Sequence, residues 1–104
     1  MNFNEYQEES RKTWIFDHNN DFVRSVLGIC GEAGEIAEKV KKHFRGDYKL
    51  EPQEIGKELG DLLYYIARVA DYYKIDLHTI AIENIKKLQS RKERDKIKGS
   101  GDNR

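Results

Sequence analysis

Apolar residues recur at every third or fourth position along most of the chain, and this spacing predicts helices. The expected helices cover about residues 4–16, 21–45, 53–74 and 77–94. Turn-forming residues separate or follow them at 17–21, 45–48, 75–76 and 99–103. Asn4 and Asp76 are the candidate N-caps of the first and fourth helices. No segment shows the alternation of a half-buried strand, so the pattern predicts an all-α four-helix bundle.

The chain is highly charged for a folded domain. Charged residues make up 37% of its 104 residues and hydrophobic residues 38%. The apolar stripe of the second expected helix, which includes Cys30, Val40 and Phe44, contributes to what must be a thin core. We therefore expect a second copy of the chain to complete the core, in a homodimer or a homotetramer.

Several classes of protein are excluded by composition. A single cysteine cannot form an intramolecular disulfide, and no apolar run approaches the ~18 residues of a membrane span. The polar first residues do not resemble a signal peptide, which favours a cytoplasmic location with no membrane partner. We expect residues 1–98 to form one domain and residues 99–104 a tail.

The net charge of zero, from 19 basic and 19 acidic residues, argues against nucleic-acid binding. It is the sum of two unlike parts. Residues 86–104 hold eight basic and three acidic residues, a net charge of +5, so residues 1–85 carry −5. The chain thus has an acidic body and a basic end.

Acidic residues follow helical spacing on the second and third expected helices. Glu32 and Glu35 lie three positions apart on one helix, and Glu58 and Asp61 do so on the other. If the two helices pack antiparallel, these carboxylates can surround one space, and their repulsion would be relieved by cations that prefer oxygen ligands, Mg²⁺ or Mn²⁺. The alternative is a solvated helix face with ordinary i,i+4 ion pairs such as Glu35–Lys39. The Glu-x-x-His pairs of a di-iron bundle are absent from the sequence.

Two longer stretches carry a resemblance to a known family. The residues at 28–42 and 57–67 resemble those of the MazG-like all-α nucleoside triphosphate pyrophosphohydrolases. The mark of that family is ExxE, a spacer and ExxD, and this chain has Glu32-x-x-Glu35, 22 intervening residues and Glu58-x-x-Asp61. The resemblance extends over nearly the whole chain, from the opening at Asn4 to the Gly-Ser-Gly-Asp-Asn-Arg ending.

The resemblance implies an enzyme that hydrolyses a nucleoside triphosphate between its α and β phosphates, releasing a monophosphate and pyrophosphate. It implies that Glu32, Glu35, Glu58 and Asp61 hold Mg²⁺, with Mn²⁺ as a substitute. Glu32 and Glu35 are the candidate catalytic residues. Glu32 is the acid that we expect to orient or deprotonate the attacking water.

The basic end of the chain supplies candidate phosphate ligands. Asn84, Lys87 and Arg91 lie at i, i+3 and i+7, on one stripe of the fourth expected helix. They match family positions implicated in substrate binding, with the amide suited to a base or sugar and the two cations to phosphate oxygens. The alternative is a solvated cationic helix end, which the helix dipole favours.

Aromatic residues are candidates for the wall of a base site. Tyr65 follows Asp61 by one turn on the same stripe, and Trp14 lies in the first expected helix. The alternative for both is packing in the core. Two other functions stay open: a hydrolase restricted to deoxynucleotides such as dUTP or dCTP, and a non-catalytic helical module for oligomerisation or regulation.

Overall fold

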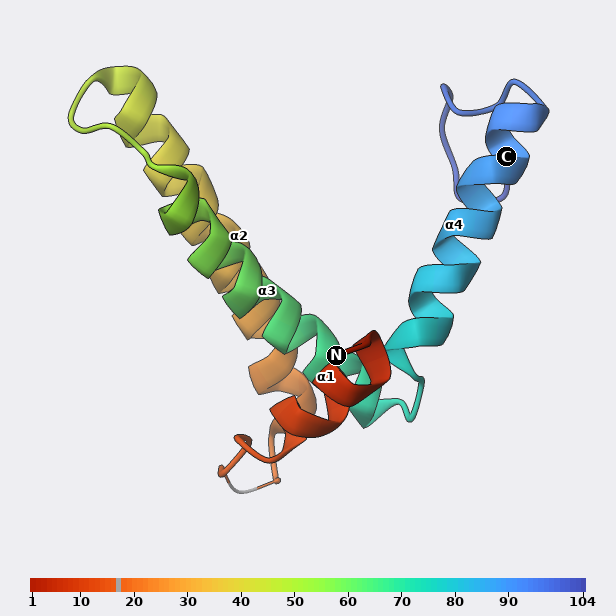
Figure 1. The fold of residues 1–104 in the computed structure, drawn as a ribbon, viewed down its shortest axis with the longest axis horizontal. Coiled ribbons are helices and arrows are strands. Elements are labelled where there is room, and N and C mark those ends of the chain that lie inside the picture. Colours follow the sequence, from red (N-terminus) through yellow and green to blue (C-terminus); the bar gives the residue numbers. More distant parts are fainter. Residues whose placement is uncertain (17) are drawn as a thin grey trace.

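A computed structural model describes residues 1–16 and 18–104. The four helices are α1 (Phe3–Arg11), α2 (Asp21–Arg45), α3 (Pro52–Tyr72) and α4 (Leu77–Glu93), with no strand among the described residues. This confirms the all-α fold. The helices are arranged as a V, in which α2 and α3 form one arm, α4 forms the other, and α1 packs where the arms meet (Figure 1).

A tight connection makes α2 and α3 an antiparallel pair. The α2 helix ends at Arg45 and is capped by Gly46, whose φ of +89° is a left-handed conformation that glycine adopts without steric cost. The ring of His43 accepts a hydrogen bond of 2.9 Å from the Leu50 amide, and Pro52 then opens α3 at a position that needs no amide donor. This hairpin lays the ExxE segment beside the ExxD segment.

The first helix is shorter than the sequence predicts. Its N-cap is Asn2, not Asn4, because the Asn2 side chain accepts a hydrogen bond of 2.8 Å from the Glu5 amide. The helix ends at Arg11, and the amide of Trp14 donates to a carbonyl only three residues back, at 3.2 Å. The β-branched and aromatic residues at 13–16 are weak helix formers, which explains the early end. Residue 17, part of the expected turn, lies outside the described residues.

Side chains of α1 cap the start of α4. Gln7 is 5% exposed, and its amide oxygen accepts a hydrogen bond of 2.8 Å from the Leu77 amide while its amide nitrogen donates to the Ile75 carbonyl at 3.0 Å. Asn4 accepts a bond of 3.2 Å from the His78 amide. The first amides of a helix have no partner within it, so these bonds stabilise α4 and set its direction relative to α1.

A charged network joins α1 to α3. The buried Arg68 donates hydrogen bonds of 2.8 Å to both the Gln7 carbonyl and the Ser10 hydroxyl. Asp71 accepts from Arg11 at 2.7 Å and from Arg68 at 3.1 Å. The hydrogen bond from Arg11, together with the positive charges of Arg68 and Arg11, lowers the pKa of Asp71.

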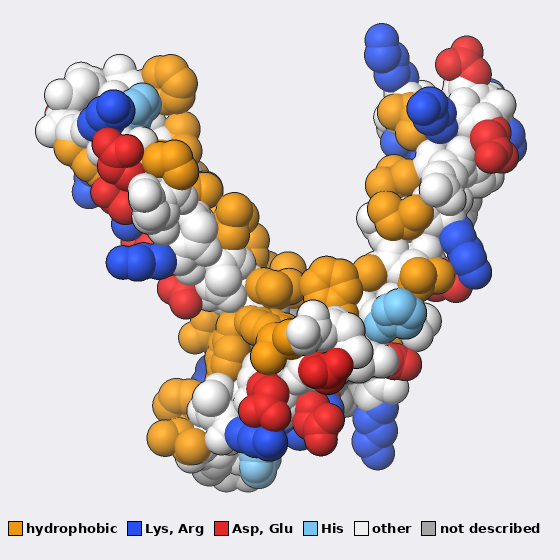
Figure 2. All heavy atoms as spheres, viewed as in Figure 1, with side chains coloured by type: hydrophobic (Ala, Val, Ile, Leu, Met, Phe, Trp, Pro, Cys, Tyr) orange, Lys and Arg blue, Asp and Glu red, His pale blue; other side chains and the backbone are white. Residues whose placement is uncertain are grey.

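The single chain has little core. Its buried apolar residues among those described are Ala67, Ala70 and Leu77, whereas Phe44 is 84% exposed. Cys30 and Val40, which the sequence places on an apolar stripe, are exposed too. The radius of gyration is 16.6 Å, against about 13 Å for a compact chain of this length. Hydrophobic side chains line the inner sides of both arms (Figure 2). Within the described residues, no helix has the length and apolarity to cross a bilayer.

Candidate active site

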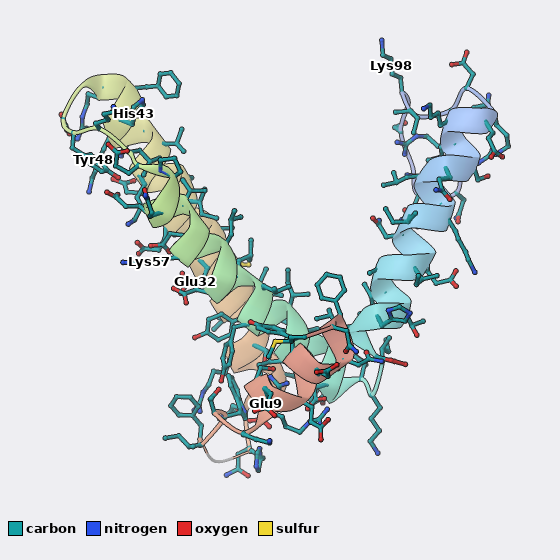
Figure 3. The ribbon with its side chains drawn as sticks, viewed as in Figure 1. Glu9, Glu32, His43, Tyr48, Lys57 and Lys98 are labelled. Carbon is teal, nitrogen blue, oxygen red and sulfur yellow. The ribbon has the colours of Figure 1, made fainter. Side chains whose placement is uncertain are left out.

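Three carboxylates converge where α2 packs against α3. Glu32 comes from α2, and Glu58 and Asp61 come from successive turns of α3. One oxygen atom of each side chain lies within 4.8 Å of the others. Figure 3 shows Glu32 partway along the α2–α3 arm. The antiparallel pairing of the two helices thus brings acids that lie 26 and 29 positions apart in the sequence to one place.

The cluster carries an excess of negative charge. Burial, a hydrogen bond with Glu58 and the nearby charges of Asp61 and Glu35 together raise the pKa of Glu32. The ammonium of Lys39 lies 3.3 Å from a carboxylate oxygen of Glu58 and offsets part of this charge. Because Lys39 is a single cation beside three carboxylates, the cluster keeps an excess of negative charge that suits a further positive ion.

The donor set fits a hard divalent cation. Oxygen ligands alone suit Mg²⁺ or Mn²⁺ rather than zinc, which prefers nitrogen and sulfur. Glu35, the fourth acid that the sequence predicts here, is exposed and does not belong to the group of oxygens within 4.8 Å. Three positions along a helix rotate a side chain by about 60° away from its predecessor. Glu35 nevertheless lies close enough for its charge to act on Glu32.

An aromatic cavity adjoins the carboxylates. It has a volume of about 360 Å³ and is lined by Glu32, Asp61, Tyr64 and Tyr65. The Tyr65 ring meets the Trp14 ring edge to face, with centroids 6.3 Å apart. Tyr65 therefore lies beside the acids, and Trp14 lies behind it.

Neighbouring residues hold these rings in place. The indole nitrogen of Trp14 donates a hydrogen bond of 2.8 Å to Asp21 at the start of α2. The Tyr64 hydroxyl accepts one of 2.8 Å from Thr13. The segment that follows α1 thus fastens the aromatic wall to both α2 and α3.

Gly28 lets the Tyr65 ring approach the backbone of α2. A Cβ atom at Gly28 would lie 2.4 Å from Cδ1 of Tyr65, a distance that real contacts do not show. A Cβ atom at Gly31 or Gly34 would meet nothing within 4 Å in the single chain. The three-residue glycine spacing thus serves close packing at the first of its positions.

The candidate phosphate ligands lie on the other arm. Asn84 and Lys87 line a separate cavity of about 470 Å³ on α4. Arg91 is 5% exposed, and its guanidinium contacts Asp102. Figure 3 shows Lys98, near the end of this arm, far from Glu32 on the other. Within one chain, the structure does not bring these residues to the carboxylate cluster.

Sequence reasoning missed two residues of the site. The alternative of a solvated helix face would pair Lys39 with Glu35 one turn before it, but Lys39 pairs with Glu58 across the helix interface. Tyr64 was not among the candidate site residues, but it lines the cavity together with Tyr65. The position of Tyr64, one turn after Gly60 and next to Tyr65, could have indicated a place in the site. Nothing in the local spacing indicates the partner of Lys39.

An all-α chain with an oxygen-only acidic cluster beside an aromatic cavity has the parts of a metal-dependent hydrolase. Comparison with known proteins identifies the family: residues 23–94 match the MazG nucleotide pyrophosphohydrolase domain. The chain belongs to this family, whose members are hydrolases that act on nucleotides. The "Gene 37 protein" of Mycobacterium phage L5 is 48% identical over 83 residues, which cover 76% of this chain and 73% of that protein. No solved structure matches the chain.

Proposed function

We propose that the protein hydrolyses a nucleoside triphosphate to the monophosphate and pyrophosphate, with Mg²⁺ as its cofactor and Mn²⁺ as a substitute. The observation that carries this proposal is the convergence of Glu32, Glu58 and Asp61 beside the aromatic cavity. Membership in the MazG family supports the reaction class. Clearance or control of a nucleotide pool, with a canonical or a damaged substrate, is the cellular role that this reaction serves.

Each residue has a role that follows from its place. Glu32, Glu58 and Asp61 would hold Mg²⁺, with Glu35 one helix step away as the fourth acid. When bound, the ion neutralises phosphate oxygens and makes water more acidic. Glu32 is suited to take the proton of the attacking water, because its carboxylate lies with those of Glu58 and Asp61 and also borders the aromatic cavity.

The hydrolysis requires no reactant other than the nucleoside triphosphate and water. The water oxygen bonds to the α phosphorus, and the bond between that phosphorus and the bridging oxygen to the β phosphate breaks. Pyrophosphate leaves with the bridging oxygen, and the water proton passes to Glu32. Tyr65 would contact the base or the sugar from the aromatic side of the cavity, with Trp14 supporting its ring from behind.

A second copy of the chain is part of the proposal. The accessible surface of the single chain is 7860 Å², about 1,800 Å² more than a compact protein of this mass exposes. Burying that excess on each of two chains gives an interface in the range of obligate homodimers. The exposed isoleucines and leucine of α4, namely Ile80, Ile82, Ile85 and Leu88, would supply apolar contact area. A homotetramer would pair two such dimers.

The same assembly would complete the site. Because α4 lies on the arm opposite the acids, Asn84 and Lys87 would reach the carboxylate cluster of a partner chain rather than their own, while the buried Arg91 contacts Asp102. A mixing experiment tests this arrangement. Glu58→Gln and Lys87→Glu chains, each inactive alone, are unfolded together and refolded. Sites shared between chains restore about a quarter of the wild-type activity, because half of the dimers are mixed and each has one intact site. No restoration contradicts sharing.

The central experiment measures pyrophosphate release. The purified chain is incubated with a panel of NTPs and dNTPs, with Mg²⁺, with Mn²⁺ or with a chelator. We expect metal-dependent release of one pyrophosphate per monophosphate. Activity confined to dUTP or dCTP would narrow the substrate to deoxynucleotides. No release from any nucleotide, at enzyme concentrations that reveal slow turnover, would refute the enzymatic proposal and leave a helical interaction module.

The metal assignment has its own matched control. Glu32→Gln removes a charge from the cluster, and Glu38→Gln removes one from the same helix at an exposed ion pair with Lys41. We expect the first variant to lose activity and the second to keep it. Equal activity of the two variants would contradict the role of Glu32.

A further inference from the structure

Residues 94–104 fold back onto α4 and form a closed loop, here called the Asp102 loop. The loop begins where Asp95 takes a left-handed φ of +56°, and two glycines turn the chain, Gly99 at +133° and Gly101 at +85°. The guanidinium of Arg94 donates a hydrogen bond of 2.8 Å to the backbone oxygen of Arg104, which ties the start of the loop to its end. The segment that the sequence treats as a tail is thus an ordered part of the α4 arm.

Arg104 holds the loop together from inside. Its guanidinium donates three hydrogen bonds to backbone oxygens, to Lys96 at 3.0 Å, to Gly101 at 2.6 Å and to Ile97 at 2.9 Å. Its side chain also lies against Gly99, where a Cβ atom would come within 3.2 Å of its Cδ. These contacts fix the backbone on both sides of Asp102 without touching the side chains of α4 that the proposed function uses.

The loop delivers one carboxylate to two cations of α4. Asp102 accepts a hydrogen bond of 2.7 Å from the ammonium of Lys87 and one of 3.2 Å from the guanidinium of Arg91. The same guanidinium nitrogen of Arg91 donates to the Asp102 carbonyl at 2.5 Å. The Arg91 side chain is only 6% exposed, whereas that of Lys87 is 39% exposed. Arg91 therefore anchors the loop, and Lys87 keeps an accessible ammonium beside it.

We propose that Asp102 is a positioning residue for phosphate binding: it holds the ammonium of Lys87 in the orientation that meets a triphosphate, with Arg91 and Arg104 fixing the loop that carries it. This rests on the proposed function, in which the α4 cations bind the substrate. A free lysine side chain loses rotational freedom when it binds a ligand, which weakens binding. A lysine already held by one of its three donors loses less, and two donors remain for phosphate oxygens.

The direction in which KM changes when Asp102 loses its charge distinguishes a positioning role from simple electrostatic repulsion. A carboxylate next to the phosphate site repels a triphosphate, so removing its charge alone would tighten binding. Loss of positioning acts in the opposite direction. Asp102→Asn keeps the size of the side chain and removes the charged hydrogen bonds. We expect it to raise KM about two- to fivefold, a size in keeping with an exposed ion pair, and to leave kcat nearly unchanged.

The matched control is Asp95→Asn. Asp95 lies in the same loop and carries the same charge, but no ion pair or side-chain hydrogen bond joins it to Lys87 or Arg91. This variant measures the effect of losing one negative charge at this end of the molecule. We expect its KM to equal or fall slightly below that of the wild type.

A second variant and a second readout complete the test. Arg104→Gln loosens the loop at a distance from Lys87 and should raise KM in the same direction. Binding of inorganic tripolyphosphate, measured by calorimetry without metal, should weaken in parallel in both variants while helix content stays unchanged. If the wild type is active and Asp102→Asn shows neither a higher KM nor a weaker affinity for tripolyphosphate, this inference is overturned and the proposed function is not. A wild type that neither hydrolyses a nucleotide nor binds tripolyphosphate overturns the proposed function and this inference with it.

Discussion

Replacing Gly28 with alanine probes the contact that holds the aromatic wall. The added methyl carbon would lie 2.4 Å from Cδ1 and 2.5 Å from Cε1 and Cγ of Tyr65. Carbon atoms in contact are about 3.5–4.0 Å apart, so the ring or α2 must move by about 1 Å. Rotation of the ring cannot avoid the clash, because Cγ lies on the axis about which the ring turns.

Two opposing terms set the stability of this variant. Overpacking of this kind costs about 1–3 kcal/mol. Alanine is favoured over glycine inside a helix by about 1 kcal/mol, so the net loss is about 0–2 kcal/mol. Gly34→Ala and Gly56→Ala are matched controls, since their methyl groups meet nothing within 4 Å and only the gain in helix propensity remains. Gly28→Ala should therefore be about 1–3 kcal/mol less stable than either control.

Urea unfolding followed by far-ultraviolet circular dichroism measures this difference. All variants are compared at one chain concentration, because association would shift the midpoint by mass action. Thermal unfolding gives a second estimate, with about 4–8 °C expected for each kcal/mol in a domain of this size. A displaced Tyr65 ring would also change the cavity beside the acids, so KM should rise in Gly28→Ala. Equal stability of Gly28→Ala and Gly34→Ala would refute the close contact between the ring and α2.

Three further predictions follow from the site and the network behind it. Glu58→Gln should lower turnover at least ~100-fold while far-ultraviolet circular dichroism stays unchanged, because a ligand is lost and repulsion is relieved; activity within twofold of the wild type contradicts this. Gln7→Leu should cost about 1–3 kcal/mol in urea unfolding, since buried partners at the start of α4 lose their hydrogen bonds; a neutral effect would show that α1 does not cap α4. The lowered pKa of Asp71 means that its contribution to stability is present above the ordinary aspartate pKa of about 3.9 and is lost as the pH falls through the lowered value. The stability difference between the wild type and Asp71→Asn should thus be constant from about pH 7 to 5 and shrink below about pH 4, and a difference unchanged at lower pH would contradict this sign.

The spacing of apolar residues predicted the bounds of some helices better than those of others. The predicted starts and ends of α2 and α4 agree with the structure to within a residue or two, because Gly46 and Asp76 are strong local signals. The end of α1 was missed by five residues. There the apolar spacing continues through Trp14, but the segment serves packing against α3, and tertiary contacts decide its conformation.

The acidic cluster shows the limit more sharply. Spacing identifies Glu32, Glu58 and Asp61 as members of two helical pairs, and the structure brings these three together. The spacing alone does not decide whether Glu35 joins these three acids, since that depends on the rotation of α2 against α3. The partner of Lys39 depends on the same rotation, and Lys39 pairs with Glu58 across the interface rather than with Glu35 on its own helix.

The sequence by itself determined the helical class, the two acidic motifs and the separation of an acidic body from a basic end. All of these are properties of spacing and composition along one chain. Only the tertiary structure decided which carboxylates converge, that α4 points away from them, and that the Asp102 loop occupies Lys87 and Arg91. A helical repeat fixes the angles between side chains about one axis. The rotation and distance between two axes depend on long-range contacts, such as the ring of Tyr65 against Gly28 and the cap of Gln7 on α4, that no local pattern records.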